Sequence, residues 1–333
     1  MEEKMNLAEM KRTRRLRTIK DNNAVLILTL VLLIAFLFVD GYKNSFYNVL
    51  RYTAMYGPVC LGLGIVMITG NIDLSAGFQA GFAGVTSVLG FNAAYQASGD
   101  PAFSLLAGIL IAIATGAVTG AINGLVIAKI GVPSLIATIA SNYAFQGLVF
   151  YYAKSSFSPE DAAIVKLAAQ TSIGGMKWLT PTLIIFVVIA AALFLWMYKT
   201  RFGSSIYVVG DNPEAAAFAG ISVKNTVWIA YILCGILASV SGFFMVSNAG
   251  YAIYTQGNSL ATLTISCCVI GGIKMAGGKG TMLHVVLGVL IMRAISQIMA
   301  SLFLSASMVN LITGILLIVV LIIDRFTSNK TVE

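Results

Sequence analysis

Charged residues are scarce in this sequence, and their scarcity excludes several classes of protein. Asp, Glu, Lys and Arg make up 10% of the 333 residues, whereas 58% are hydrophobic. A soluble domain carries about 25% charged residues, so this chain has too few charges to cover a soluble globule. Intrinsic disorder is excluded as well, because disordered chains combine low hydrophobicity with high charge. The composition indicates a membrane protein that crosses the bilayer several times.

Residue types that carry catalysis or bind metals are also sparse. The chain has a single histidine, and its four cysteines all lie inside apolar runs without the spacing of a zinc site or a disulfide framework. The sequence contains no Walker A, H-E-x-x-H or G-x-S-x-G pattern. We therefore expect no metal site, no bound cofactor and no enzymatic activity in this chain.

Long uncharged runs, in contrast, are abundant and set the number of expected helices. Crossing about 30 Å of hydrocarbon takes about 20 mostly apolar residues. The run at 225–273 is too long for one span, and polar stretches at 247–250 and 256–258 divide it. The sequence predicts an all-α polytopic membrane protein with ten spans, at 24–39, 52–69, 76–95, 103–128, 133–152, 179–198, 226–247, 259–273, 282–304 and 307–323.

The basic residues lie mostly on one side of these spans. With the N-terminus inside, fifteen Lys and Arg residues occupy cytoplasmic segments and five occupy outer segments. Because basic residues favour the cytoplasmic side, we expect both termini there. The predicted organisation is a basic segment at 1–23, one transmembrane domain at 24–323 and a tail at 324–333. This topology accounts for the net charge of +8, so nucleic-acid binding by the basic run at 11–15 is not favoured.

Glycines recur inside the predicted spans. Gly116, Gly120 and Gly124 are four residues apart and therefore lie on one helix face. Small residues at this spacing let helix backbones approach closely in lipid. The series predicts tight packing within the bundle, and a contact between two copies of the chain is the alternative.

An acid flanked by glycines interrupts the apolar pattern between the second and third expected spans. Asp73 lies within the segment 70–77, which has glycine at both ends, and Ser75 is placed to cap the helix that follows. This composition at a membrane edge predicts either an interrupted, gate-like backbone or an ordinary cytoplasmic turn.

The cytoplasmic loop at 199–225 contains the pattern of a short helix at 213–219. The helix is preceded by an asparagine suited to an N-cap, begins with a proline and an acid, and is followed by a glycine suited to a left-handed stop. An apolar helix of this kind suits a groove in a partner protein, whereas a helix lying on the membrane surface is the alternative. The residues expected to dock are Asn212, Pro213, Glu214, Ala215, Ala216, Phe218 and Gly220.

The outer loop at 154–178 carries a second helix signal. Ser158, Glu160 and Asp161 form a capping pattern, and an amphipathic stretch follows as far as Ala169. We expect a short helix on the outer surface that either receives a partner or covers the bundle.

Polar side chains within the spans are candidates for a solute pathway. Arg293 and Gln297 are four residues apart on one helix face, and an arginine in hydrocarbon usually faces a wet cavity or a partner. Amides within the spans are equally typical of structural hydrogen bonds between helices. The residues assigned to a translocation pathway or its gate are Asp73, Ser75, Asn142, Gln146, Arg293 and Gln297.

Several segments, taken together and in order, resemble one family. They are 70–77, 124–133 with 136–138, 200–203, and 269–272 with 277–280. The most specific is Gly210-Asp211-Asn212-Pro213-Glu214-Ala215-Ala216, followed by Gly220-Ile221. With these motifs the chain resembles the membrane permease subunit of ribose/galactose-type sugar ABC importers, a group that includes autoinducer-2 permeases.

The resemblance implies a multi-pass permease in the bacterial cytoplasmic membrane. A binding protein would deliver a sugar or similar solute, and two permease copies, identical or paired with a close relative, would form the pathway through the bilayer. Separate ATPase subunits would bind ATP and dock on the coupling helix at 213–219. One departure concerns the acidic run that the family often carries, because the aligned positions here are Ala261, Thr262 and Leu263.

An ion-coupled secondary transporter of a small polar solute is the alternative function. Such a protein needs carboxylates within its spans as ion sites. The expected spans hold no acid at mid-depth, and Asp73 lies at an edge. The sequence therefore favours the ATP-driven importer.

Overall fold

The computed structural model describes residues 42–168 and 178–305, together with 307–309, 311–315, 318 and 322. Over these residues the chain is helical, and its one β-type pairing is an isolated bridge between Phe157 and Ala252. The all-helical fold class is confirmed. Three predicted segments lie outside the described residues: the basic segment at 1–23, the expected span at 24–39 and the tail at 324–333. Part of the expected span at 307–323 lies outside them as well.

The helices follow one another with short connections. In chain order they are α2 (Tyr42–Ile68), α3 (Ala76–Ser98), α4 (Pro101–Gly124), the π-helical turn η1 (Leu125–Ile130), α5 (Ser134–Tyr152), α6 (Ala163–Ala168), α7 (Pro181–Lys199), α8 (Arg201–Asp211), α9 (Pro213–Phe218), α10 (Val223–Ala249), α11 (Leu260–Ile270) and α12 (Met282–Ser301). Five segments in the described part are long and apolar enough to cross a membrane: Ser45–Ile68, Pro101–Ile130, Pro181–Lys199, Val223–Ala249 and Met282–Ser301.

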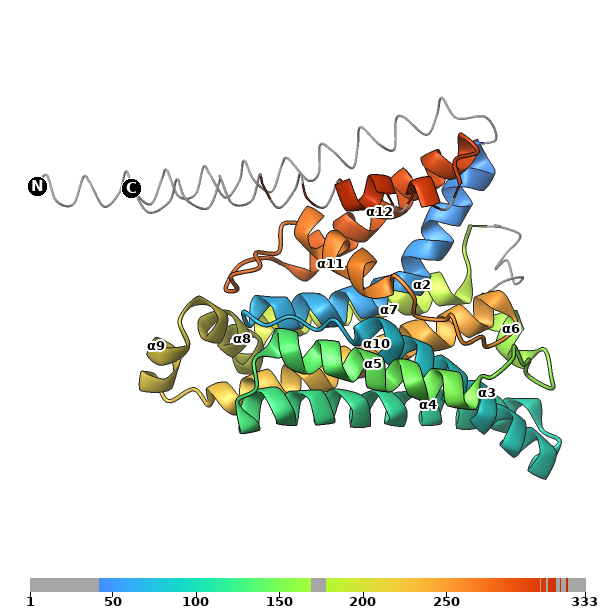
Figure 1. Ribbon diagram of the computed structural model, residues 1–333, viewed down its shortest axis with the longest axis horizontal. Coiled ribbons are helices and arrows are strands. Elements are labelled where there is room, and N and C mark those ends of the chain that lie inside the picture. The colour runs from blue at the N-terminus through green and yellow to red at the C-terminus, as the bar shows by residue number, and fades with distance from the viewer. Residues whose placement is uncertain are drawn as a thin grey trace, which may run out of the picture.

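Helices α4, α5 and α10 run along the long axis of the molecule, whereas the first half of α2 runs at a steep angle to them (Figure 1). In that view α8 and α9 lie at one end of the bundle and α6 lies at the other. The loop at 199–225 and the residues 154–168 are therefore at opposite ends of the bundle, as the topology predicted from the basic residues requires. The short outer helix is found at Ala163–Ala168, and the Asp161 carboxylate accepts the amide of Ala163 at 2.8 Å.

Two helices differ in length from the sequence prediction. Helix α2 begins at Tyr42 and not at 52, because the helix continues through Arg51, whose charge was interpreted as a boundary. Helix α11 covers Leu260–Ile270, eleven residues or about 16 Å, which is half of the hydrocarbon thickness. The expected span at 259–273 is therefore not a full crossing as a helix, and the described residues do not establish ten spans.

The glycine series on α4 packs inside the bundle against α10. A Cβ added to Gly116 would collide with the backbone oxygen of Gly235 and lie 2.7 Å from the Cβ of Ser239. A Cβ added to Gly120 would lie 3.0 Å from the Cα of Ile232. The two backbones thus touch along this seam, which confirms the packing interpretation of the series.

Candidate functional site

The first candidate site is the pair of short helices α8 and α9, which we call the coupling hairpin after the docking role that the sequence analysis predicts for the helix at 213–219. The side chain of Asn212 accepts the amide of Ala215 at 2.9 Å and so caps α9. Gly220 follows the helix with a φ of +79°, the left-handed conformation expected of it. The predicted helix is present and ends at Phe218, one residue earlier than expected.

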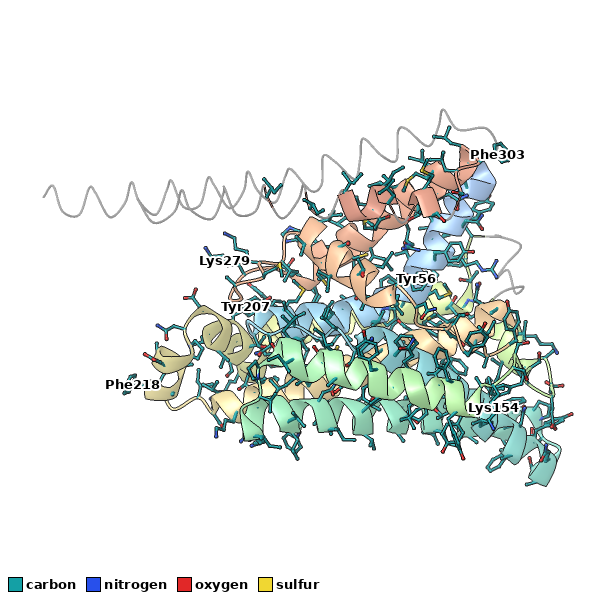
Figure 2. The ribbon with its side chains drawn as sticks, viewed as in Figure 1. Tyr56, Lys154, Tyr207, Phe218, Lys279 and Phe303 are labelled. Atoms are coloured by element: carbon teal, nitrogen blue, oxygen red, sulfur yellow. The ribbon has the colours of Figure 1, made fainter. Side chains whose placement is uncertain are left out.

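Helix α9 has one anchored face and one free face. Ala216 is fully buried, whereas the side chain of Phe218 is 93% exposed and points away from the bundle (Figure 2). The other residues predicted to dock, including Glu214, are exposed as well. The free face of α9 therefore includes both Glu214 and Phe218.

Helix α8 also belongs to this site, and the sequence analysis did not predict this helix. Thr200 caps it by accepting the amide of Gly203 at 3.1 Å, and Ile206 and Val209 are buried. A threonine followed by apolar residues at helical spacing was the signal that could have revealed this helix.

The coupling hairpin touches the bundle through backbone atoms. A Cβ added to Gly210 would collide with the carbonyl oxygen of Ile68 and lie 2.6 Å from the amide nitrogen of Gly278. The Tyr207 hydroxyl donates to the carbonyl oxygen of Gly280 at 3.0 Å. Burial raises the pKa of Tyr207 above its ordinary value of 10.0, so the hydroxyl remains a donor near neutral pH. The hairpin therefore bears directly on the end of α2 and on the loop before α12.

The second candidate site is a buried polar cluster where α3 begins. The Asp73 carboxylate accepts the amide of Ser75 at 2.9 Å, the Ser75 hydroxyl at 2.5 Å and the side-chain amide of Gln79 at 3.0 Å. All three residues are fully buried. Ser75 occupies the N-cap position of α3, as predicted, but its hydroxyl bonds to Asp73 and makes no capping bond to a helix amide.

Side chains from α4 and α10 complete this cluster. Asn123 donates to the Ser75 hydroxyl at 2.7 Å. The Thr119 hydroxyl lies 3.3 Å from the side-chain oxygen of Gln79 and shares its one hydrogen between this oxygen and the backbone oxygen of Thr115. From α10, the Tyr231 hydroxyl donates to the backbone oxygen of Ile72 at 2.9 Å. Sequence reasoning did not identify Gln79, Thr119 or Tyr231. Of these, Gln79 carried a signal, because it lies four residues after Ser75 and so on the same helix face.

The other predicted pathway residues lie on two separate helices. Asn142 and Gln146 are partly buried on α5, and they share one helix face with Phe150. The ring of Phe150 contacts that of Tyr254 with centroids 5.5 Å apart. This contact directs the amide-bearing side of α5 toward the loop that precedes α11.

Arg293 and Gln297 lie on α12, which packs against α2. The Arg293 guanidinium carbon is 4.7 Å from the centroid of the Tyr56 ring, a cation–π contact. The Arg293 Nε is buried and has no hydrogen-bond partner within the described ranges. Helix α5 packs against α3 instead, so the structure does not bring the two predicted pairs together.

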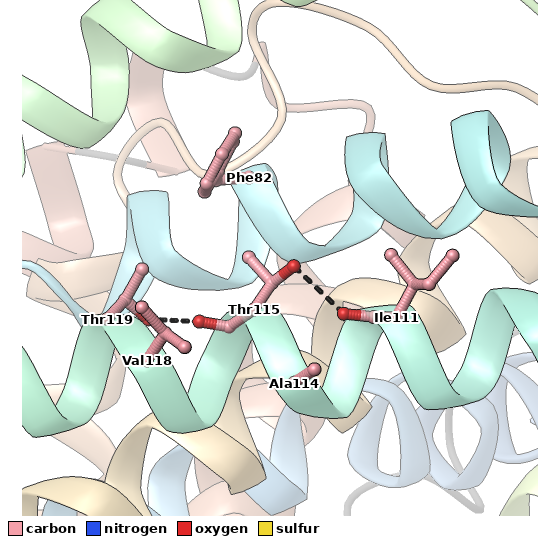
Figure 3. Close-up of a pocket in the computed structure, with 6 residues that line it drawn as sticks. All are labelled: Phe82, Ile111, Ala114, Thr115, Val118 and Thr119. Carbon is pink, nitrogen blue, oxygen red and sulfur yellow. Dashed lines mark hydrogen bonds between the residues drawn. The ribbon is translucent and has the colours of Figure 1, made fainter.

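A groove on the side of the bundle is formed by α3 and α4. It has a volume of about 320 Å³ and is lined by Phe82, Ile111, Ala114, Thr115, Val118 and Thr119 (Figure 3). The hydroxyls of Thr115 and Thr119 donate to the backbone oxygens of Ile111 and Thr115 at 2.8 and 2.9 Å. Because these donors are already engaged, the groove offers little to a polar solute.

Comparison with known proteins gives one family and a set of relatives. The family described as "Branched-chain amino acid transport system / permease component" matches residues 45–321. The autoinducer 2 import system permease protein LsrC of Yersinia pestis (strain Pestoides F) is 28% identical over 304 residues, which cover 89% of this chain and 83% of the relative. LsrC of Yersinia pseudotuberculosis serotype O:3 (strain YPIII) is equally similar, with the same identity and coverage. No solved structure matches this chain.

Proposed function

Because the chain belongs to the permease family of ABC importers described as "Branched-chain amino acid transport system / permease component", we propose that it forms the translocation pathway of an ATP-driven importer. The transported solute is a sugar or a similarly small polar molecule, delivered by a binding protein on the outer side. The relatives with full-length similarity are named for autoinducer 2 import, which supports an organic solute of this size class. ATP is bound and hydrolysed by a separate subunit.

The coupling hairpin is the observation that carries this proposal. Phe218 is 93% exposed at the end of the bundle opposite to α6, while the backbone of α8 contacts the end of α2. A groove on the ATPase that holds α9 would therefore move a surface already in contact with the transmembrane helices. Each ATPase subunit needs one such helix, so two permease chains are expected in each complex, as a homodimer or with a close relative.

The solute pathway is proposed to use the amides of α5 and the cationic face of α12. Asn142 and Gln146 offer donors and acceptors that suit hydroxyl groups. Arg293 brings guanidinium donors to the middle of a membrane-spanning helix, where Tyr56 covers it from one side. A charge at this depth is stabilised by water or by a polar solute, which supports a hydrated pathway beside α12.

An ion-coupled transporter is the alternative, and it is less well supported. An ion site needs a carboxylate free to bind the ion. Asp73 is buried and already accepts three hydrogen bonds from Ser75 and Gln79. Uptake that continues without the ATPase subunit and stops with an ionophore would favour this alternative over the importer.

The family to which the chain belongs points to a bacterial cytoplasmic membrane as the location.

Two substitutions in the coupling hairpin test the importer assignment. Glu214→Lys reverses the charge of the first turn of α9, and Gly220→Val forces a β-branched residue into a left-handed backbone conformation. We expect each variant to insert normally and to lose at least about tenfold in ATPase binding and in solute uptake. Pull-down of the ATPase and uptake into vesicles measure both effects.

The matched control is Glu160→Lys, the same charge reversal at the outer end of the bundle. This control should leave ATPase binding unchanged, because Glu160 lies three residues before α6, and α6 and α9 are at opposite ends of the bundle. Undiminished ATPase binding and uptake in both hairpin variants would contradict the coupling assignment.

A further inference from the structure

The segment at 69–75 connects the two candidate sites. It follows the last residue of α2, Ile68, and ends where α3 begins. At its start, the amide of Gly278 donates to the carbonyl oxygen of Ile68 at 2.9 Å, and the backbone of Gly210 in α8 touches the same oxygen. At its end lies the Asp73 cluster. The segment therefore has the coupling hairpin at one end and the membrane interior at the other.

The interior end is held by a carboxylate that has no cationic partner. Within the described residues, no Lys, Arg or His lies within ion-pair distance of Asp73, whose hydrogen-bond donors come from Ser75 and Gln79. Hydrogen bonds to an ionised acceptor are about twice as strong as neutral ones. A buried carboxylate that loses its donors carries a large desolvation cost, so the cluster resists deformation.

Two further bonds fasten the segment to other helices. Asn123 reaches Ser75 from α4 at 2.7 Å, and Tyr231 reaches the backbone oxygen of Ile72 from α10 at 2.9 Å. In addition, a Cβ added to Gly77 would lie 2.9 Å from the backbone oxygen of Gly257, so the first turn of α3 has no free space on that side. A displacement of the segment must therefore be shared by α3, α4 and α10.

We propose that Asp73 is a positioning residue for transport: it locks the segment at 69–75 into a rigid link that passes the displacement of α8 to α3, α4 and α10. The proposal rests on the proposed importer function, because it assumes that an ATPase moves the hairpin. Asp73 does not touch the solute. It acts through Ser75 and Gln79, and without it the segment absorbs the motion that the hairpin delivers.

The test compares the ATP hydrolysed per solute transported in the complete complex, reconstituted with its ATPase and binding protein. Asp73→Asn keeps the size of the side chain, removes the charge and leaves one donor of Gln79 or Ser75 without an acceptor. We expect about a tenfold rise in ATP consumed per solute, with ATPase binding unchanged. The matched control is Thr86→Val, which removes another hydroxyl contact between α3 and α4, the 3.0 Å pair of Thr86 with Thr115, and should leave the ratio unchanged.

Tyr231→Phe is the second variant, because it deletes a single hydroxyl and keeps the ring. It removes the bond to Ile72 and should raise the same ratio by about threefold. A wild-type ratio in an assembled Asp73→Asn complex would overturn the proposal. If that variant fails to assemble, a wild-type ratio in Tyr231→Phe overturns it.

The proposed function is tested separately by the wild-type complex. If wild-type uptake needs no ATPase, the importer assignment itself fails. If uptake needs ATP and the Asp73→Asn ratio is normal, the assignment stands and only the role of Asp73 is refuted.

Discussion

The coupling hairpin and the Asp73 cluster lie at the two ends of one short segment, yet they are built in opposite ways. The hairpin is held by local bonds, such as that of Asn212 to Ala215, and it presents Phe218 to a partner. The cluster adds to the local bonds of Asp73 two bonds between residues 48 and 159 positions apart in the chain, and it is completely buried. The difference agrees with the proposed roles, in which the hairpin binds another protein and the cluster stays rigid.

The largest expected effect concerns the helix seam that supports the cluster. Gly116→Leu would push a side chain into the backbone of α10 at Gly235, which cannot move aside without separating the helices. We expect the folding stability to fall by more than about 3 kcal/mol, because the backbone of α10 cannot move away from the added side chain without losing its packing. Little or no monodisperse protein should remain after extraction. Size-exclusion chromatography in detergent measures the outcome.

Gly147→Leu on α5 is the control, since no atom lies within 4 Å of its added Cβ. It should purify as the wild type does. Equal yields from both variants would show that the interior accepts a large side chain as readily as the surface does. The buried region could then no longer be described as rigid.

An intermediate effect is expected from Asn123→Ala within the cluster. The variant removes the donor that binds the Ser75 hydroxyl and leaves a small void. We expect a destabilisation of about 1–3 kcal/mol, visible as a lower midpoint of thermal unfolding in detergent. Asn225→Ala, an exposed asparagine at the start of α10, should change the midpoint much less. Equal shifts would mean that the buried bonds contribute no special rigidity.

The smallest effect on stability is expected from Phe218→Ala. The side chain is 93% exposed, so its removal should change the stability of the isolated permease by less than about 0.5 kcal/mol. Binding of the ATPase should nevertheless weaken by about tenfold, because an exposed aromatic residue is a typical anchor of an interface. A variant that is destabilised on its own but binds normally would reverse the roles assigned to the two regions.

Local sequence was enough to predict the hairpin because its determinants are neighbours in the chain. The cap, the proline, the acid and the left-handed glycine lie within nine residues, 212–220, and the structure has α9 at Pro213–Phe218. Helix α8 was missed because a loop was inferred from the gap between spans, although Thr200 and the buried Ile206 carry a helix signal.

The cluster was only partly predictable. Asp73 and Ser75 stood out as an acid and a hydroxyl between glycines. Asn123, which binds Ser75, and Tyr231, which binds the backbone of Ile72, lie on helices that the sequence cannot orient. The pairing of Asn142 with Arg293 in one pathway remains a prediction, because α5 and α12 pack on different helices in the described part.

Composition alone determined that this chain is a helical membrane protein, because so few charges cannot cover a soluble surface and long uncharged runs require lipid. The basic residues further predict which loops face the cytoplasm, since their side preference is a property of each loop. Tertiary structure decided how long α2 and α11 are and which polar groups meet around Asp73. In the interior, a buried donor or acceptor must find a partner wherever packing places one, and the partner's distance along the chain has no bearing on that choice.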